Sequence, residues 1–392
     1  MNQFKYVIVG GGMTGASAAS GIRDVDARGS LAMFGDESHA PYDRPPLSKA
    51  LWKGEPLESI WRKTADLGIE LHLGRRIAAL DPAAKTVTDG SGIEYRYEKL
   101  LLATGGSPKR LPFADAGAIY FRTLDDYQRV RQLAREGAPF AVMGGGFIGS
   151  EVAAALAMNG VRVTMIFPEH GVGARTYPAL LSGFLDAYYQ SNGVTVLPGE
   201  VVGAIEKSGT KTIIKTISGR SMSVDAVVVG MGLRPRVELA HAAGLRVDNG
   251  IAVDRFLRTS DLDIYAAGDV ASFLSTALDG RIRVEHEDNA NTMGRLAGRN
   301  MAGQSEPYDH LPFFYSDLFE LGYEAVGELD SRLDMIEDWK DRFRKGVIYY
   351  LKEGKVRGVL LWNTWNRVEA ARELISKKER LSRTALIGRI SD

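Results

Sequence analysis

The sequence predicts an α/β fold made of two similar halves of alternating strands and helices, followed by a smaller α+β region. Short apolar runs alternate with helical stretches along most of the chain. A strand, a glycine cluster and a helix also follow one another twice. From Leu311 onward there is no such cluster, and strand-like pieces rich in aromatic residues alternate before a last helix.

In the first half, a β-rich apolar run over Lys5–Val9 leads into the cluster 10–15 and then into an Ala/Ser-rich helix. In the second half, the run Phe140–Met143 leads into the cluster 144–149 and another helical stretch. Later β-rich stretches, at 94–106 and 223–232, end each half with glycines. The repetition predicts one structural plan used twice.

The rest of the chain carries weaker signals. Residues 247–267 read as turns and strands, a helix is expected at about 289–301, and strand-like pieces over 345–362 precede a helix at about 367–378. The last residues, from 382 on, carry no readable signal. We therefore expect one domain at 1–112 and 236–310, a second at 113–235, and a C-terminal α+β domain at 311–392.

Length and composition fit a cytoplasmic globular protein of two or three domains. The chain has 392 residues, and its 49 basic and 49 acidic side chains balance, which argues against a large nucleic-acid footprint. It contains no cysteine, which excludes disulfides, thiolate-held metals and catalytic thiols. Neither a signal peptide nor a membrane-length apolar run is evident, and the six histidines show no metal-binding spacing.

Both glycine clusters have the spacing G-x-G-x-x-G between a strand and a helix, which is typical of Rossmann-like dinucleotide binding. The glycines permit a tight turn, a close approach of the pyrophosphate and close packing of helix on strand. They are Gly10, Gly12 and Gly15 in the first half, and Gly144, Gly146 and Gly149 in the second. An acidic residue for a ribose diol follows each next strand, namely Asp36 and Glu169. Two nucleotide sites in one chain indicate hydride transfer between a nicotinamide and a flavin.

The second acidic residue favours NADH over NADPH. Selection of NADP usually requires basic residues that meet its 2′-phosphate. Glu169 would repel that phosphate, although Arg175 stands nearby and could bind it. The sequence thus predicts FAD and NADH as cofactors, with NADPH as the alternative.

Several blocks also resemble a known family. The segments PYDRPPLSK, ATGG, GGGFIGSE and AAGD are similar to those of oxygenase-coupled ferredoxin and rubredoxin reductases, whose fold is glutathione-reductase-like. The segments VTMIFPEHG, RVEHEDNANTMGRLAGRNMAG and LLWNTWNRVEAARELI resemble apoptosis-inducing factor and its bacterial relatives within the same superfamily. The resemblance covers nearly the whole chain.

The resemblance implies a role for each matching residue. Asp36 would bind the adenosine ribose of FAD, Arg44 its pyrophosphate portion, and Asp269 the ribityl chain. The helix beginning near Asp288 would aim its positive end at the flavin pyrimidine. Further FAD contacts are implied at Ala103, Thr104, Gly105 and Arg122, and further NAD contacts at Ile148 and Gly232. For Arg44, a surface arginine fixed between prolines is the alternative.

Lys49 and Glu151 are the implied catalytic residues. By resemblance they would form an ion pair beside flavin N5, the atom that receives the hydride, and would orient the nicotinamide. A structural salt bridge is the alternative, because such pairs also occur without chemistry.

Two residues depart from the family pattern. Glu287 stands where the relatives place a tryptophan or histidine beside the flavin, and Tyr315 replaces a tryptophan before Ser316-Asp317. By resemblance, both residues lie on the side of the flavin from which electrons leave. The sequence therefore determines the identity of the electron acceptor less well than that of the hydride donor.

Two functions remain open at this point. One is a reductase that passes electrons to a ferredoxin, a rubredoxin or another acceptor, acting as a monomer or homodimer. The other is a protein like apoptosis-inducing factor with slow catalytic turnover, in which a charge-transfer complex of flavin and nicotinamide serves as a redox signal or assembly partner. The basic stretches 339–346 and 376–383 are interleaved with acids and predict solvated faces, with a ferredoxin-docking patch as the alternative.

Overall fold

The computed structural model describes residues 2–115 and 117–390, which form two compact units. The first unit holds the described residues up to Asp43, Leu57–Ser107 and Arg234–Phe313. The second holds Arg44–Pro56, Pro108–Leu233 and the described residues from Phe314 on. The mixed α/β fold class expected from the sequence is confirmed, while the three-domain division stays a prediction.

The first unit is built on a mainly parallel sheet of seven strands in the order β3-β2-β1-β6-β5-β4, with β18 also paired to β6. Its central strands are parallel to one another, and β4, β5 and β6 are joined as antiparallel neighbours. The central strands β1 and β6 end in buried apolar runs, at 6–9 and 100–102, as is typical of parallel strands covered on both faces. The strands are β1(Asn2–Val9), β2(Leu31–Phe34), β3(Glu70–His72), β4(Ile77–Asp81), β5(Thr86–Asp89), β6(Glu94–Leu102) and β18(Ile264–Ala266).

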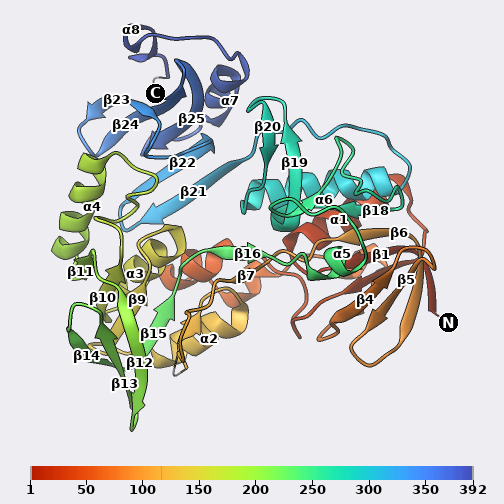
Figure 1. Cartoon of the computed structure of the whole chain (residues 1–392), viewed down its shortest axis with the longest axis horizontal. Coiled ribbons are helices and arrows are strands. Elements are labelled where there is room, and N and C mark those ends of the chain that lie inside the picture. The colour runs from red at the N-terminus through yellow and green to blue at the C-terminus, as the bar shows by residue number, and fades with distance from the viewer. Residues whose placement is uncertain (1, 116, 391–392) are drawn as a thin grey trace. The chain divides into compact units, whose positions relative to one another are not determined.

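Two helices, α1(Met13–Val25) and α6(Glu287–Met301), lie side by side in this unit (Figure 1). Small residues bring their backbones close together. A Cβ added to Gly298 would stand 2.0 Å from the carbonyl oxygen of Ala18, so glycine is required there. The unit also contains α5(Glu238–Ala242), the 3₁₀ helices η3(Leu57–Ile60), η4(Ala65–Leu67) and η5(Gly268–Val270), and the small sheet β17(Ile251–Ala252), β19(Ala271–Ser275) and β20(Gly280–Ile282).

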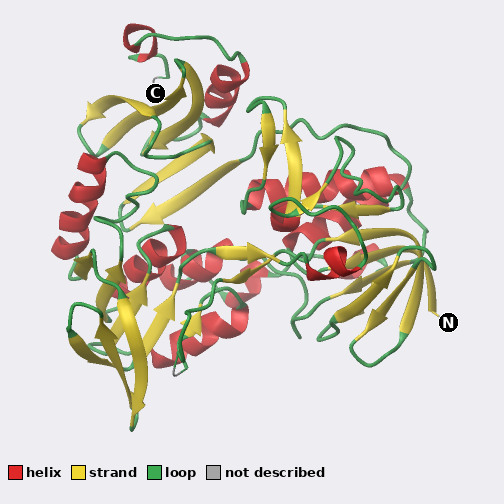
Figure 2. Cartoon of the chain, in the orientation of Figure 1, coloured by secondary structure: helices red, strands yellow, loops and turns green. Residues whose placement is uncertain are grey.

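The second unit repeats the plan with a parallel sheet of five strands in the order β11-β10-β9-β15-β8. Helices alternate with these strands along the chain, as Figure 2 shows by colour. The strands are β8(Ile119–Tyr120), β9(Pro139–Met143), β10(Arg162–Phe167), β11(Thr195–Pro198) and β15(Ala226–Val229). The helices are α2(Leu124–Leu133), α3(Phe147–Met158) and α4(Ala179–Ser191), and the 3₁₀ helices are η1(Pro45–Ser48) and η2(Ala50–Lys53).

Antiparallel sheets complete the second unit. A three-stranded sheet follows β11, and a five-stranded sheet in the order β21-β22-β25-β24-β23 contains most of the C-terminal region. The first consists of β12(Val202–Ser208), β13(Lys211–Thr216) and β14(Ser221–Val224). The second consists of β21(Phe313–Leu318), β22(Leu321–Gly327), β23(Asp334–Asp341), β24(Lys345–Lys352) and β25(Lys355–Trp362). The chain also forms α7(Val368–Ser376), α8(Arg383–Leu386) and the paired strands β7(Gly106–Pro108) and β16(Leu233–Pro235).

The expected elements correspond closely to those observed. Strands β1 and β9 contain the two runs that precede the glycine clusters, and α6 and α7 are the two helices expected late in the chain. The short helix α8 carried no signal in the sequence because it is a single turn. In the described part of the chain, no helix is both long and apolar enough to cross a membrane.

Candidate active site

The first glycine cluster forms an open cradle between β1 and α1. A Cβ on Gly10 would stand 2.1 Å from the carbonyl oxygen of Ala103, and one on Gly15 would stand 2.1 Å from that of Gly10. A Cβ on Gly12, the N-cap of α1, would meet no described atom within 4 Å. Two glycines are thus required by packing, while the middle one leaves space at the start of the helix.

The second cluster has the same geometry between β9 and α3. A Cβ on Gly144 would stand 2.4 Å from the carbonyl oxygen of Gly230, and one on Gly149 would stand 2.0 Å from that of Gly144. Gly146 caps α3 and again has no described atom within 4 Å of a Cβ position. Ile148, an implied NAD contact, is 40% exposed on the first turn of this helix.

These two cradles fit the pyrophosphate of a dinucleotide. Neither α1 nor α3 has a side-chain hydrogen bond at its N-cap or an acidic residue in its first turn. The first backbone N–H groups of a helix have no partner within the helix, and they carry its positive end. An anion placed over Gly12 or Gly146 would therefore meet the positive end of a helix, in space that a side chain would otherwise fill.

Each of the two carboxylates predicted to bind a ribose forms an ion pair with an arginine. Asp36, two residues beyond β2, pairs with Arg236 at 3.2 Å. Glu169, two residues beyond β10, pairs with Arg175. Arg175 is thus held by the carboxylate that was expected to oppose a 2′-phosphate. Its side chain is 82% exposed.

Arg236 contacts three of the predicted site residues, Asp36, Thr104 and Gly105, although no sequence pattern selects it. Its backbone N–H donates to Gly105, and its carbonyl accepts from the Thr104 hydroxyl at 2.7 Å. It thereby connects Asp36 with the stretch Ala103–Gly105, all of which were assigned to FAD by resemblance. The only sequence signal was an arginine four residues beyond Gly232, which no spacing rule selects.

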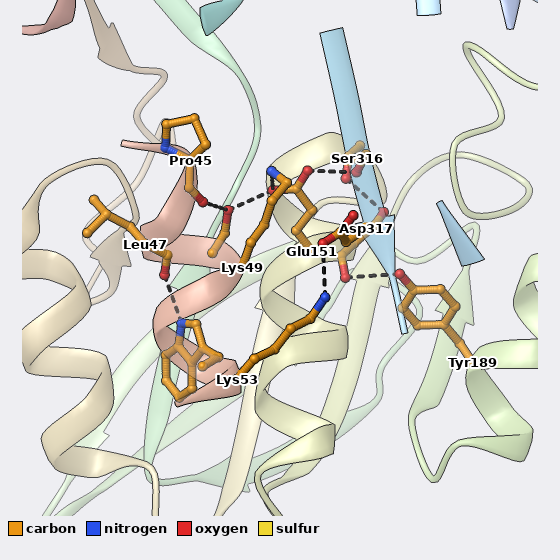
Figure 3. A network of polar contacts seen from close by, with 12 residues as sticks. Pro45, Leu47, Lys49, Lys53, Glu151, Tyr189, Ser316 and Asp317 are labelled. Carbon is orange, nitrogen blue, oxygen red and sulfur yellow. Dashed lines mark hydrogen bonds and ion pairs between the residues drawn. The ribbon is translucent and has the colours of Figure 1, made fainter. Parts of the chain in front are cut away.

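Lys49 and Glu151 form an ion pair, as the resemblance implied. The Lys49 ammonium lies 2.7 Å from Glu151 Oε2, and the two side chains are 11% and 3% exposed. Lys49 stands between η1 and η2, and Glu151 projects from the second turn of α3 (Figure 3). Because an unpaired buried charge is costly, each of these groups depends on the other.

Two serine hydroxyls complete the surroundings of the Glu151 carboxylate. Ser48 donates to Oε2 and Ser316 donates to Oε1, both at 2.6 Å (Figure 3). Tyr315 places its ring 5.1 Å from the Lys49 ammonium, a cation–π distance. The carboxylate is therefore held from three sides, and its cation faces an aromatic ring.

An open pocket lies next to this ion pair in the second unit. It is lined by Pro46, Lys49, Ala50, Lys53, Tyr315 and Asp317. Lys53 and Asp317 form a more exposed ion pair at its rim, at 3.0 Å. The lining of the pocket thus includes both Lys49 and the aromatic residue that its ammonium faces.

The remaining predicted residues lie as follows. In the second unit, Arg44 donates to the backbone carbonyl of Arg122 at 2.9 Å, so two implied FAD contacts lie together. Gly232 has a positive φ of 87° and accepts from the Lys109 N–H. In the first unit, Asp269 lies in η5 and is partly buried.

The start of α6 differs from the starts of α1 and α3. Its first turn carries two carboxylates, Glu287 and Asp288, which offset the positive end of the helix. Asp288 accepts from the Phe313 N–H and contacts the His310 ring at 2.5 Å. Burial lowers the pKa of His286, the N-cap of this helix, to about 4. No described residues gather three or more His, Asp or Glu side chains in a way that could hold a metal ion.

Residues 4–294 match the family described as pyridine nucleotide-disulphide oxidoreductases. The chain belongs to this family. It is an NAD(P)H-dependent FAD oxidoreductase, although the chain itself has no cysteine and hence no reactive disulphide. Residues 297–340 and 335–377 match the C-terminal family of mitochondrion-associated apoptosis-inducing factor.

Relatives come from both groups that the sequence resembles. The chain is 34% identical to a 5,5′-dehydrodivanillate O-demethylase ferredoxin reductase subunit of Sphingobium, over 98% of this chain and 96% of that protein. It is 31% identical to a putative apoptosis-inducing factor 1 of Drosophila melanogaster, over 96% of this chain, but it spans only 63% of the fly protein. A monodehydroascorbate reductase of Pisum sativum is 33% identical over 92% and 91% of the two chains.

Solved structures agree with this placement. The ferredoxin reductase of the CYP199A2 system from Rhodopseudomonas palustris matches with a TM-score of 0.90 and 30% identity, over 98% of both chains. A covalent complex of putidaredoxin reductase with putidaredoxin matches with a TM-score of 0.89 and 31% identity, over 98% and 95%. The resemblance stated from the sequence is therefore confirmed, as is the glutathione-reductase-like flavoprotein fold.

Proposed function

We propose that this protein takes reducing equivalents from NADH through FAD and passes them to a ferredoxin-type electron carrier. The observation that carries the proposal is the pair of matching glycine cradles at Gly12 and Gly146, one in each compact unit. Two such cradles fit two dinucleotides, and reductases of ferredoxin-type carriers are among the similar proteins.

In this proposal, each cofactor has its own set of residues. FAD is held by the first cradle, by Asp36 with Arg236, and by the other FAD contacts that the resemblance implied. NADH is held by the second cradle and by Glu169. Bound FAD supplies a ring that accepts an electron pair from a nicotinamide and can release electrons singly.

The chain's own residues then position the nicotinamide. Lys49 lines the pocket, and its contacts with Glu151 and the Tyr315 ring restrict its side chain. Burial of Glu151 strengthens the ion pair by excluding water from it. A nicotinamide ring bound against the Lys49 ammonium would already have lost most of its orientational freedom before the reaction. Positioning of this kind lowers the activation barrier.

Glu169 supports NADH rather than NADPH. Its carboxylate can accept from the hydroxyls of a ribose, while it would stand close to the roughly two negative charges of a 2′-phosphate. We expect Glu169→Gln to raise kcat/KM for NADPH relative to NADH by about tenfold. Arg175→Ala removes the arginine that pairs with Glu169 and is expected to lower kcat/KM for NADPH below that of the wild type. A Glu169→Gln enzyme with an unchanged nucleotide preference would contradict the assignment.

The function is tested by anaerobic reduction of the purified holoprotein. NADH is expected to bleach the flavin absorbance quickly, and an added ferredoxin is expected to restore it. Absence of FAD from the protein, or no bleaching with either NADH or NADPH, would overturn the proposal. The acceptor is narrowed by comparing ferredoxins, a rubredoxin and small-molecule acceptors under the same conditions.

A second candidate has its own support. The match of residues 297–377 to the C-terminal family of apoptosis-inducing factor favours an NADH sensor that oxidises NADH only slowly. Such a protein would show slow reduction, a long-wavelength charge-transfer band that persists in air, and a change in oligomeric state with NADH. Fast turnover with a carrier and a constant mass in light scattering would reject it.

The remaining assignments concern assembly and compartment. We propose a cytoplasmic protein that works as a monomer or homodimer. Cell fractionation and light scattering of the oxidised holoprotein test these two points.

A further inference from the structure

We propose that Ser316 and Ser48 are positioning residues that act through Glu151 to hold the Lys49 ammonium in place. This inference rests on the proposed function and identifies how the C-terminal region contributes to it. Ser316 belongs to β21, the first strand of the C-terminal sheet, and Ser48 ends η1. Neither hydroxyl needs to touch a nucleotide to have this effect.

The two oxygens of the Glu151 carboxylate have different partners. Oε2 forms the ion pair with the Lys49 ammonium, at 2.7 Å, and accepts from the Ser48 hydroxyl, at 2.6 Å. Among the described residues, Ser316 is the only one whose side chain donates to Oε1. Because the two oxygens have different donors, the carboxylate cannot rotate without losing a charge-assisted hydrogen bond. The orientation of Oε2, and with it the position of the ammonium, is fixed from the far side by Ser316.

The strand geometry of β21 explains how one segment does this. Side chains alternate along a strand, so Ser316 turns inward and is 1% exposed, while Tyr315 is 36% exposed. Tyr315 faces the Lys49 ammonium. Ser316 donates to Glu151, and Asp317 pairs with Lys53 (Figure 3). Tyr315 and Asp317 thus line the pocket, while Ser316 between them contacts the buried carboxylate of Glu151.

Packing alone does not require a serine at this position. A buried strand position is filled as well by alanine, and a hydroxyl is costly to bury unless it is hydrogen-bonded. Here the hydroxyl finds its partner in a buried charge, where hydrogen bonds are stronger than between neutral groups. The chemistry of residue 316 therefore serves the carboxylate rather than the sheet.

The test is stopped-flow reduction of the holoprotein by NADH, which separates the limiting reduction rate from NADH affinity. Ser316→Ala is expected to lower the limiting rate about tenfold, since one charge-assisted hydrogen bond is lost. Ser48→Ala is expected to have a smaller effect, because Lys49 still holds Oε2. Ser316→Thr keeps a hydroxyl and is expected to restore most of the rate. The matched control is Ser182→Ala, since Ser182 is equally buried in the same unit and donates only to the Val172 carbonyl.

A double-mutant cycle with Lys49→Met distinguishes positioning from general stabilisation. If Ser316 acts through the ion pair, adding Ser316→Ala to Lys49→Met lowers the limiting rate no further. If the double variant loses the product of the two single-variant factors in limiting reduction rate, Ser316 acts independently of the ion pair and the inference is overturned. A Ser316→Ala limiting rate equal to that of the wild type would also overturn it. FAD content and melting temperature are measured for each variant. If Ser316→Ala lowers these two quantities and leaves the limiting reduction rate unchanged, the serine serves folding alone. Failure of NADH to reduce the wild type would instead overturn the proposed function.

Discussion

The two open positions over the helix starts make a sharp prediction for Gly146→Ala. The backbone of Gly146 has φ −85° and ψ −169°, an extended conformation that alanine adopts without strain. No described atom lies within 4 Å of the added Cβ, so the methyl group enters the cradle and not the protein core. Unfolding stability should change by less than about 1 kcal/mol, the usual range for changes at an N-cap.

Binding of NADH should change far more. A methyl group in the cradle holds the pyrophosphate away from the N–H groups at the start of α3. The loss of two charge-assisted hydrogen bonds, each about 1.5 kcal/mol, amounts to about 3 kcal/mol. That corresponds to a Kd for NADH about 100-fold weaker. FAD content should not change, because the first cradle is untouched.

The assay is reduction rate against NADH concentration, with FAD content and thermal unfolding measured on the same preparations. Gly12→Ala is the mirror experiment, expected to weaken FAD and spare the apoprotein's stability. Gly149→Ala is the contrasting control, because its Cβ would stand 2.0 Å from the Gly144 carbonyl oxygen and should destabilise the fold itself. A Gly146→Ala protein that binds NADH as the wild type does would refute the placement of the nucleotide over α3.

Three further results are expected. Lys49→Met should lower unfolding stability by about 3 kcal/mol in chemical denaturation, because the buried Glu151 loses its cation; no loss would mean that the carboxylate has other compensation. Arg236→Asn should weaken FAD binding to the apoprotein in fluorescence titration, whereas Arg234→Asn, which removes an exposed pair with another partner, should not; equal effects would remove Arg236 from the site. The pKa of His286 is about 4 when folded and near 6.5 when unfolded, so the unfolded chain binds a proton first and stability should fall as pH drops from 6.5 to 4, by at most about 3 kcal/mol. His286→Gln should flatten that pH dependence in denaturant titrations, and an unchanged slope would assign it to other groups.

Much of the fold could be predicted because its signals are local. Strand β1 ends in an apolar run at 6–9 and β9 is apolar throughout, and the glycines after them follow a fixed spacing, so both appear in the sequence without any tertiary information. The same holds for α6, whose helical pattern is long. Helix α8 escaped notice because a single turn has no periodicity to detect.

The assignment of segments to compact units was not readable in this way. Residues 44–56, with the PPLSK block, would be placed with the first half by their position in the chain. The structure groups them instead with the second unit, because η1 and η2 pack on α3. Which surfaces a short segment covers depends on residues a hundred positions away, and no local pattern records that.

The sequence by itself determined the two glycine cradles, because a tight turn and a close approach to neighbouring backbone leave only glycine at fixed positions. It also determined, through resemblance, that Lys49 and Glu151 belong together. Only the tertiary structure decided what holds them. Ser316 and Arg236 carry no motif, and their roles arise because a hydroxyl and a guanidinium from distant parts of the chain meet the carboxylates of Glu151 and Asp36. Hydrogen bonds act over about 3 Å in space, and that distance is set by packing, which sequence spacing does not encode.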